Sequence, residues 1–423
     1  RPKISELPND ATYGGNTDNK YTQQYGKQQG KYYVPQRASA GLDPWATPQA
    51  YDNAKDFFDT GITWSNSLNV AQMLEKSSYS ISLGNTHQDG IISSTGMDRY
   101  NVKVSADTKL TSNWSSGFTA NYITTSIDKA VTSGNGLLRT VYAAPPSYDL
   151  AGIPSHVDGN PYTQNSFRGS FDNAYWAMEN NKFTEDTNRF FGNVYTSYQT
   201  DFGTTNHKLN AKYMVGVDAY TTHYVDSYGY GSNTGGGRGQ IENYGWTNAT
   251  YNSLLTINYD WHINEDWGLN AVVGNEIIQS NRKKYYEYGT NYNFPGWNHI
   301  NNATTQQTEE ETWKNRTVGF FGNVSASYRN MLYLTLTGRQ DYVSNMPRKN
   351  RSFFYPSISA GFILTELDAL KNNVVNHAKL RVSYAEVGQA GDFLENYYST
   401  PTYGGGFYML TPIMYPMKGT TAY

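Results

Sequence analysis

Residues 79–122 read YSISLGNTHQDGIISSTGMDRYNVKVSADTKLTSNWSSGFTANY, and this stretch decides the fold. Three segments in it alternate between apolar and polar residues, as Val102 alternates with Lys103. The segments are 79–84, 100–107 and 114–122. Because successive side chains of a strand point to opposite faces, each segment is predicted to be a strand with one apolar and one polar face.

The connections between the predicted strands alternate in length along the chain. Short turns fall near residues 110, 204, 264 and 330. Long loops fall near residues 90, 155, 236 and 300, and the last three are expected to span 126–187, 224–248 and 285–313. Short periplasmic turns and long extracellular loops are typical of an up-and-down barrel in an outer membrane. We count about a dozen strands and predict an all-β, antiparallel transmembrane β-barrel.

The composition agrees with a barrel in lipid. Aromatic residues make up 15% of the 423 residues, and 38 of these are tyrosines, which aromatic girdles at two membrane interfaces would use. Mean hydropathy is −0.68, and the sequence has no apolar run of the length that a membrane-spanning helix needs. With 16% charged residues and a net charge of −3, the chain is not expected to bind nucleic acid.

The motifs of catalysis and metal binding do not occur in the sequence. Its seven histidines are scattered, and no HExxH or nucleophile–base motif is found. We therefore predict no catalytic residue, no metal ligand and no cofactor. The acidic run at residues 309–311 is expected to be a solvated loop edge, with cation binding as the alternative.

Four aromatic residues in the expected long loops are candidates for substrate contact. They are Trp176, Trp246, Tyr292 and Trp297. A flat ring can stack on the C–H face of a sugar, and the neighbouring amides can bind its hydroxyls. The alternative is that these rings anchor the loops to one another or to a partner protein.

Six polar residues on the polar faces of the predicted strands are expected to line the lumen. They are Lys103, Asp107, Asn121, Lys212, Asp218 and Asp260. Charged residues at these positions fit a wet barrel interior and do not require catalysis.

Several motifs, taken in order, resemble one family. Residues 78–122, the preceding DPWATPQAYDNAKDFFDTGITWSNSLNVA, and the later RNMLYLTLTGRQDYVS, RSFFYPSISAGFILTE and AKLRVSYAEVGQAG resemble segments of SusC/RagA-type TonB-dependent outer-membrane transporters of Bacteroidota. The resemblance covers about residues 43–392. Two stretches depart from the family pattern: GRQDYVS replaces a basic-Asp-Gly-Ser run, and VGQAG replaces a Gly-Asn turn.

The resemblance implies partners and further sequence. It implies a 22-stranded barrel closed by an N-terminal plug, a TonB box that engages the TonB complex, and a SusD-like surface lipoprotein as a lid. It also admits a dimer of such pairs. Residues 1–60 are expected to be an irregular segment after the plug, and residues 61–423 to be barrel strands and extracellular loops. Since about a dozen strands leave two edges open in lipid, further sequence is expected to complete the barrel.

The functional hypothesis is import of an oligomeric nutrient across the outer membrane, with an oligosaccharide favoured over a peptide. The main alternative is a soluble, secreted, β-rich glycan-binding module whose aromatic face packs into a core. An outer-membrane protease or lipase is a weaker alternative, because it would need a nucleophile–base pair.

Overall fold

The fold is described here in a computed structural model of the chain. The structure describes residues 20–131 except 27 and 29, 137–234 except 168 and 170, 236–346, 348–367, 370, 375–388, 398–404 and 415–420. None of the helices in these ranges is long and apolar enough to cross a membrane.

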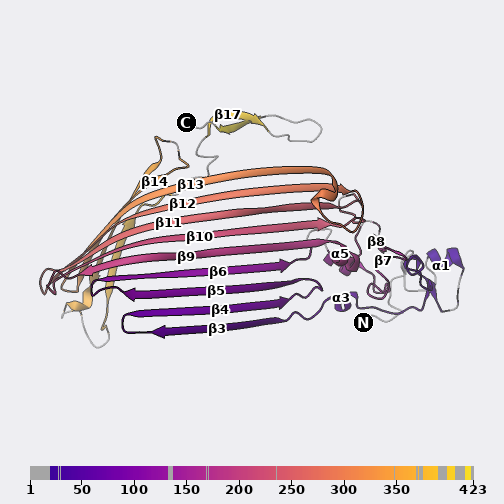
Figure 1. Cartoon of the computed structure of the whole chain (residues 1–423), viewed down its shortest axis with the longest axis horizontal. Coiled ribbons are helices and arrows are strands. Elements are labelled where there is room, and N and C mark those ends of the chain that lie inside the picture. Colours follow the sequence, from indigo (N-terminus) through magenta and orange to yellow (C-terminus); the bar gives the residue numbers. More distant parts are fainter. Residues whose placement is uncertain are drawn as a thin grey trace.

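One antiparallel sheet of 12 strands dominates the structure, which confirms the predicted count and the all-β class. Its strands follow the chain order, with β3 and β16 at the two edges. They are β3 (Thr63–Met73), β4 (Ser77–Asp89), β5 (Gly96–Lys109), β6 (Trp114–Asp128), β9 (Lys182–Thr200), β10 (His207–Tyr228), β11 (Gln240–His262), β12 (Trp267–Tyr292), β13 (Ala303–Tyr328), β14 (Leu332–Val343), β15 (Ser352–Ile363) and β16 (Lys379–Ala385). Figure 1 shows these strands side by side in a curved sheet.

The register gives the sheet one apolar and one polar face. Val102, Tyr122 and Phe190 lie opposite one another on three adjacent strands. All three are exposed, between 40% and 46%. Partners in a ladder share a face, so these residues belong to one apolar surface that no described residue covers. Such a surface is rare on a soluble monomer and is what lipid would cover.

The connections alternate as the sequence predicts. The turns at 74–76, 110–113, 201–206, 263–266 and 329–331 lie at one end of the sheet, and the connections 129–181, 229–239 and 293–302 lie at the other. Adjacent turns at the first end are joined, because Arg329 donates from Nε to Asp266 Oδ1 over 2.9 Å and from Nη2 to Oδ2 over 3.2 Å. We call the second end the long-loop end; α3 (Asn53–Phe57), α5 (Ala174–Asn180), β7 (His156–Val157) and β8 (Asn160–Gln164) gather there in Figure 1.

The predicted long loops were too long in all three cases. The strands β9 to β13 continue beyond the part of the sheet whose outer face is apolar. The connections are therefore only 129–181, 229–239 and 293–302. The cause is composition, because these extensions are rich in Thr, Asn, Tyr and charged residues and lose the apolar–polar alternation by which a half-buried strand is recognised. The acidic run 309–311, Trp246 and Tyr292 therefore lie in strands and not in loops.

The described part of the first 60 residues consists of short elements. They are α1 (Lys20–Tyr25), β1 (Tyr32–Tyr33), α2 (Pro35–Ser39), β2 (Trp45–Ala46) and α3. Residues 1–19 lie outside the described residues, and the division of the chain at residue 60 stays a prediction. The remaining elements are α4 (Leu137–Ala143), η2 (Ile300–Asn302), η3 (Leu364–Glu366) and a separate hairpin of β17 (Tyr398–Gly404) and β18 (Tyr415–Thr420).

Candidate functional site at the long-loop end

The connections at the long-loop end form a body with its own core. We call it the loop cluster and define it as residues 32–58, 137–180 except 168 and 170, 229–239 except 235, and 293–302. Its core includes Tyr32, Phe57, Leu150, Phe167 and Trp176. The first of these comes from the N-terminal segment and the last from α5, so segments more than 100 residues apart are held together by apolar burial.

Trp176 is fixed from several sides. The Asn173 side chain caps α5 by accepting from the backbone N–H groups of Tyr175 and Trp176, over 3.0 and 3.3 Å. The indole Nε1 of Trp176 donates to the Pro161 carbonyl over 2.9 Å, and the ring has no exposed surface. This predicted substrate-contact residue therefore lies inside the loop cluster, where its ring packs against protein.

A buried carboxylate joins two of the connections. Asp172 accepts from Gln164 Nε2 over 2.8 Å, from Ser232 Oγ over 2.6 Å, and from the backbone N–H and side-chain amide of Asn233 over 2.8 and 2.9 Å. Since Asp172 is only 9% exposed, these four donors replace the water that the carboxylate gives up. They hold the 229–239 connection against the 129–181 connection.

The third connection is attached through Asn298 and Tyr292. Asn298 Nδ2 donates to the Asn180 carbonyl over 2.8 Å. Tyr292 is fully buried with its hydroxyl 3.1 Å from Ser227 Oγ, and burial raises the pKa of that hydroxyl. A second predicted contact residue thus supports the fold of the loops.

Gly239 shows how tightly the Tyr292 ring is seated. Gly239 has a φ of +76°, and a Cβ there would lie 2.4 Å from the ring. Glycine is therefore required twice, for its backbone angle and for the approach of the ring.

The other two aromatic candidates are less buried than Trp176 and Tyr292. Trp297 is 44% exposed and stacks with His299, with ring centroids 4.9 Å apart, and with Phe294 at 5.8 Å. Trp246 lies on β11 and is half-buried, and its indole nitrogen is buried without a hydrogen-bond acceptor among the described residues.

Trp246 belongs to a set of five aromatic rings and one arginine on the polar face of the sheet, which we call the aromatic platform. Its members are Tyr224, Tyr244, Trp246, Arg282, Tyr286 and Trp313. Tyr224 and Tyr244 stack at 4.8 Å, and Trp246 stands edge-on to both. The guanidinium of Arg282 lies 5.2 Å from the centre of the Trp246 ring and 5.4 Å from that of Trp313. Such cation–π contacts hold a flat guanidinium in place without a carboxylate.

Carboxyl groups surround the platform. Tyr244 Oη donates to Asp226 Oδ2 over 3.0 Å, and burial raises the pKa of Tyr244. Burial also raises the pKa of the Glu242 carboxyl; the Tyr286 hydroxyl opposes that rise and the Asp226 charge adds to it. Arrays of rings, hydroxyls and carboxylates suit a ligand with many hydroxyl groups.

The sequence reasoning missed most of this platform. Tyr224, Tyr244, Tyr286 and Trp313 fell in the expected loops, although the spacing of Tyr244 and Trp246 by two residues was a strand signal. Only the register, which places Tyr224 opposite Tyr244 and Tyr244 opposite Tyr286, brings the rings together.

Residues 146–421 match the protein family described as "TonB dependent receptor-like, beta-barrel". The chain belongs to this family. A TonB-dependent receptor barrel lies in the outer membrane, which confirms the predicted location, the barrel and the family resemblance.

Relatives and solved structures agree with this assignment. The chain is 25% identical over 377 residues to the TonB-dependent receptor P26 of Formosa agariphila, covering 81% of this chain and 34% of that protein. It is also 25% identical over 358 residues to the TonB-dependent receptor SusC of Bacteroides thetaiotaomicron, covering 78% and 34%. The chain thus spans about a third of the length of these relatives.

Among solved structures, the RagAB peptide importer in its closed-closed state has a TM-score of 0.69 at 16% identity, covering 97% of this chain and 44% of that chain. The RagAB peptide transporter has a TM-score of 0.66, also at 16% identity, covering 89% and 42%. At this identity the likeness shows the fold. The compared proteins are named as receptors or importers and not as enzymes.

All six predicted lumen residues of this TonB-dependent receptor barrel share the polar face. Lys103, Asn121 and Asp218 lie in one cross-strand row, with Phe191 between the last two. Asp107 accepts from the Tyr195 hydroxyl over 2.5 Å, and the Lys212 ammonium lies 4.3 Å from the centre of the Tyr195 ring. Asp260 accepts from Asn270 Nδ2 over 2.5 Å.

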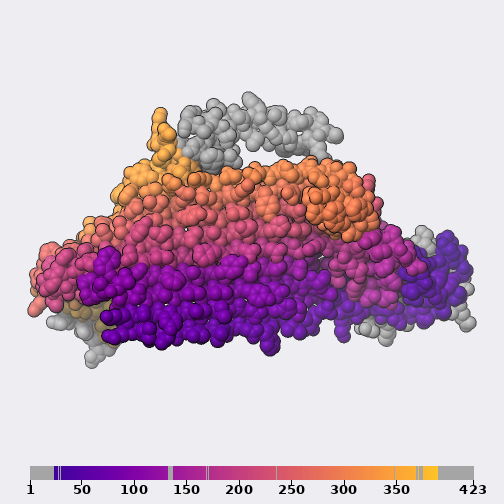
Figure 2. All heavy atoms as spheres, viewed as in Figure 1, coloured from indigo at the N-terminus to yellow at the C-terminus, as the bar shows by residue number. Residues whose placement is uncertain are grey.

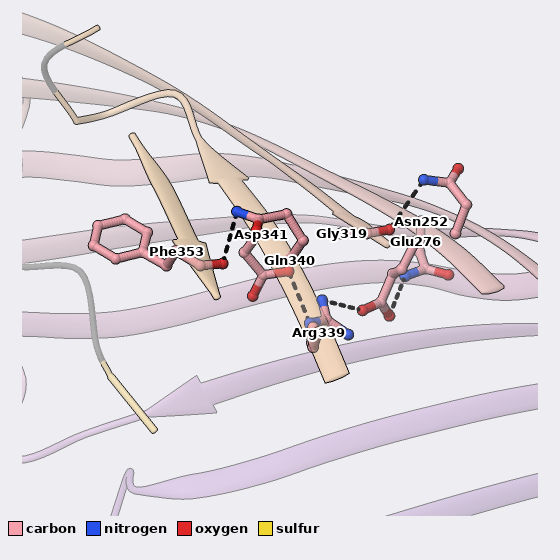
Figure 3. Close-up of polar contacts among 8 residues, drawn as sticks. Asn252, Glu276, Gly319, Arg339, Gln340, Asp341 and Phe353 are labelled. Atoms are coloured by element: carbon pink, nitrogen blue, oxygen red, sulfur yellow. Dashed lines mark hydrogen bonds and ion pairs between the residues drawn. The ribbon is translucent and has the colours of Figure 1, made fainter. Parts of the chain in front are cut away.

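The same face carries a cluster of ionised groups (Figure 3). Arg339 reaches Glu276 Oε2 on β12 over 3.0 Å and Asp341 Oδ1 on its own strand over 2.8 Å. Asn252 Nδ2 donates to the other oxygen of Glu276 over 3.4 Å. One cation thus bridges two carboxylates on the polar face. Among the described residues, no group of three or more His, Asp or Glu side chains could hold a metal ion.

Proposed function

We propose that this chain forms the wall and the extracellular mouth of a TonB-dependent importer of an oligosaccharide. The family match over residues 146–421 is the observation that carries this proposal. The apolar outer face and the three interlocked connections at the long-loop end support it. The soluble binding module is disfavoured, because its aromatic face would be packed in a core and here that face is open.

The aromatic platform is the proposed contact site for the substrate. The rings offer flat faces to the C–H surface of a sugar, and the carboxyl groups beside them offer acceptors to its hydroxyls. Of the four original candidates, Trp246 and Trp297 are proposed to contact substrate. Trp176 and Tyr292 are proposed to hold the loop cluster in shape.

The charge around the platform supports a neutral oligosaccharide over an anionic one. Asp226 and Glu242 lie beside the rings, and Arg282 is held between Trp246 and Trp313. The six polar residues from Lys103 to Asp260 are proposed to line the passage below the platform. Transport needs no covalent chemistry from this wall, so we propose that the chain is not an enzyme.

The proposed partners are a SusD-like surface lipoprotein, the TonB complex acting through a plug, and outer-membrane lipid. A dimer of transporter–lipoprotein pairs is part of the same proposal. Similarity to the TonB-dependent receptor SusC supports this arrangement. The alignment covers 34% of that protein, so most of its length corresponds to other parts of such a transporter.

Binding to the full-length protein in lipid nanodiscs tests the proposal. Titration calorimetry would compare neutral oligosaccharides, uronic-acid oligosaccharides and oligopeptides. We expect neutral oligosaccharides to bind and Trp246→Ala to weaken that binding by up to about tenfold, as expected for the loss of about 0.5–1.5 kcal/mol of ring stacking. Trp64→Ala is the matched control, because Trp64 is 65% exposed on the opposite face. Binding of peptides alone, or equal losses in both variants, would contradict the proposed substrate.

A further inference from the structure

The first half of β13 is paired on one side only. β12 pairs with β13 along its length, from Tyr292 opposite Ala303 to Trp267 opposite Tyr328. β14 pairs with β13 only from Thr317 onward. Residues 304–316 are exposed throughout, and Figure 2 shows this orange part of the chain at the surface of the long-loop end.

The backbone of this segment presents free hydrogen-bonding groups. The Arg316 carbonyl accepts from the Ser344 N–H over 2.8 Å, so the backbone of Arg316 turns away from β12. Alternate residues of a strand turn their backbone groups to the same side. The backbone N–H and C=O groups that point away from β12 are therefore those of Gln306, Thr308, Glu310, Thr312 and Lys314. Their outward N–H and C=O groups meet no partner among the residues that the structure describes.

This edge stands in water and not in lipid. On the face of β13 that carries Phe320 and Val318, the apolar side chains end at Val318. The next side chains on that face are Arg316, Lys314 and Thr312. An unpaired edge within the hydrocarbon is not tolerated, whereas a hydrated edge is stable and open to a further strand. The nine residues 306–314 offer roughly 30 Å of such edge.

The charge of the edge indicates what fits it. Glu310 and Glu311 form ion pairs with Lys283 and Lys284 of the neighbouring strand β12, over 2.8 and 3.6 Å. Glu309 makes no ion pair with any described residue. A strand added here would lie opposite this acidic run, so lysine or arginine side chains would be favoured and acidic ones disfavoured. An antiparallel pairing of two copies centred on 309–310 would set Glu309 against Glu310.

We propose that residues 306–314 form a docking edge to which an extended, basic segment of the surface partner protein adds as a strand. The added strand would complete the hydrogen bonds of the free backbone groups and place its cations beside Glu309. The inference rests on the proposed function for the existence of that partner.

Proline substitution on the edge tests the proposal, because a proline removes one N–H of known direction. Thr308→Pro loses an outward N–H and keeps the bonds to β12, so the sheet is expected to fold. Thr308→Ala is the matched control, since it keeps the N–H. The measurement is the amount of surface lipoprotein that co-purifies with each full-length variant from detergent-solubilised outer membranes. We expect Thr308→Ala to retain it and Thr308→Pro to lose it by at least about tenfold.

A crosslink locates the contact independently of affinity. These 423 residues contain no cysteine, so Thr312→Cys and Thr247→Cys each add one thiol to them for a benzophenone label, in a full-length protein whose other cysteines are replaced by serine. Thr312 is on the edge, and Thr247 is an exposed residue of β11 that is paired on both sides. We expect a crosslink to a Lys/Arg-containing segment of the lipoprotein from position 312 and none from 247.

The outcomes separate this inference from the proposed function. If the lipoprotein co-purifies equally with the proline variant and is not crosslinked from position 312, the docking edge is wrong and the importer proposal stands. A crosslink to a second copy of the chain also overturns the docking edge. If no lipoprotein co-purifies with the wild-type protein, the partner proposal itself fails and the inference fails with it.

Discussion

Gly319 lies directly opposite Glu276 in the β12–β13 ladder, and the absence of a side chain at Gly319 lets Arg339 reach the Glu276 carboxylate. A Cβ at residue 319 would lie 2.5 Å from Arg339 Nη2 and 2.5 Å from Asp341 Oδ1. The ionised cluster of Figure 3 therefore requires a glycine at residue 319.

The first prediction concerns this glycine. Gly319→Ala is expected to push Arg339 away from its two carboxylates and to lower the free energy of unfolding by about 1–3 kcal/mol, since overpacking is added to lost charge-assisted bonds. Gly322→Ala is the matched control, because its nearest neighbour would be 3.7 Å away. The measurement is the heat-induced mobility shift on gel electrophoresis in detergent. Equal shifts in the two variants would show that the cluster tolerates a methyl group.

A second prediction separates backbone strain from ring packing in the 229–239 connection. Gly236 and Gly239 have φ angles of +67° and +76°, but a Cβ at Gly236 meets nothing within 4 Å, whereas one at Gly239 meets Tyr292. Both alanine variants pay for the left-handed backbone, about 1–2 kcal/mol. Gly239→Ala is expected to be the more destabilising, with faster amide exchange around Tyr292. Similar exchange in both variants would mean that the ring can move aside.

The third prediction concerns the carboxylate that joins two connections. Asp172→Ala leaves the donors from Gln164, Ser232 and Asn233 without their acceptor, each unmet donor costing about 1–3 kcal/mol. The loop cluster is expected to open while the sheet remains intact, which limited proteolysis would detect as new cleavage within residues 137–180. Asp201→Ala, in a short turn at the opposite end, is the control and should leave the cleavage pattern unchanged.

The fourth prediction is a pH dependence at the rim of the sheet. His87 lies outside the apolar band, with Nδ1 2.7 Å from Asp98 Oδ1 and Nε2 3.3 Å from Asp89 Oδ1. The hydrogen bond to Asp98 and its charge raise the pKa of His87 above the ordinary value. The stabilisation by this pair is therefore complete below the unfolded-state pKa and is lost as the pH rises through the folded-state pKa.

An NMR titration of the His87 ring checks this prediction. Asp98→Asn is expected to lower the pKa of His87, because it removes the charge and keeps the shape of the side chain. An unchanged titration curve in that variant would assign the shift to another cause.

The sequence predicted the membrane-facing half of the sheet well and the water-facing half poorly. Around Val102 the alternation is strict, because lipid demands apolar residues on one face. Around Trp246 both faces are wet, so polar and aromatic residues occur on both, and the strand signal disappears. The loop boundaries were therefore wrong there, although the order and direction of the strands were right.

The same limit applies to the candidate site. Nothing local distinguishes Trp176, which is buried, from Trp297, which is exposed, because the difference depends on contacts with residues far away in the sequence. The aromatic platform likewise needs a register over four strands before its rings become neighbours. The polar face of the sheet, in contrast, can be predicted from the alternation of side chains alone. This alternation places Lys103 and Asp260 on the same face.

β12 and β13 each contain 26 residues, although a tilted strand crosses the hydrocarbon in about 9–11 residues. More than half of each strand therefore projects beyond the bilayer as a stiff collar. With a rise of about 3.4 Å per residue, the projecting part is roughly 50 Å long. The proposed oligosaccharide would therefore meet the top of this collar well above the hydrocarbon, before any part of it approaches the membrane.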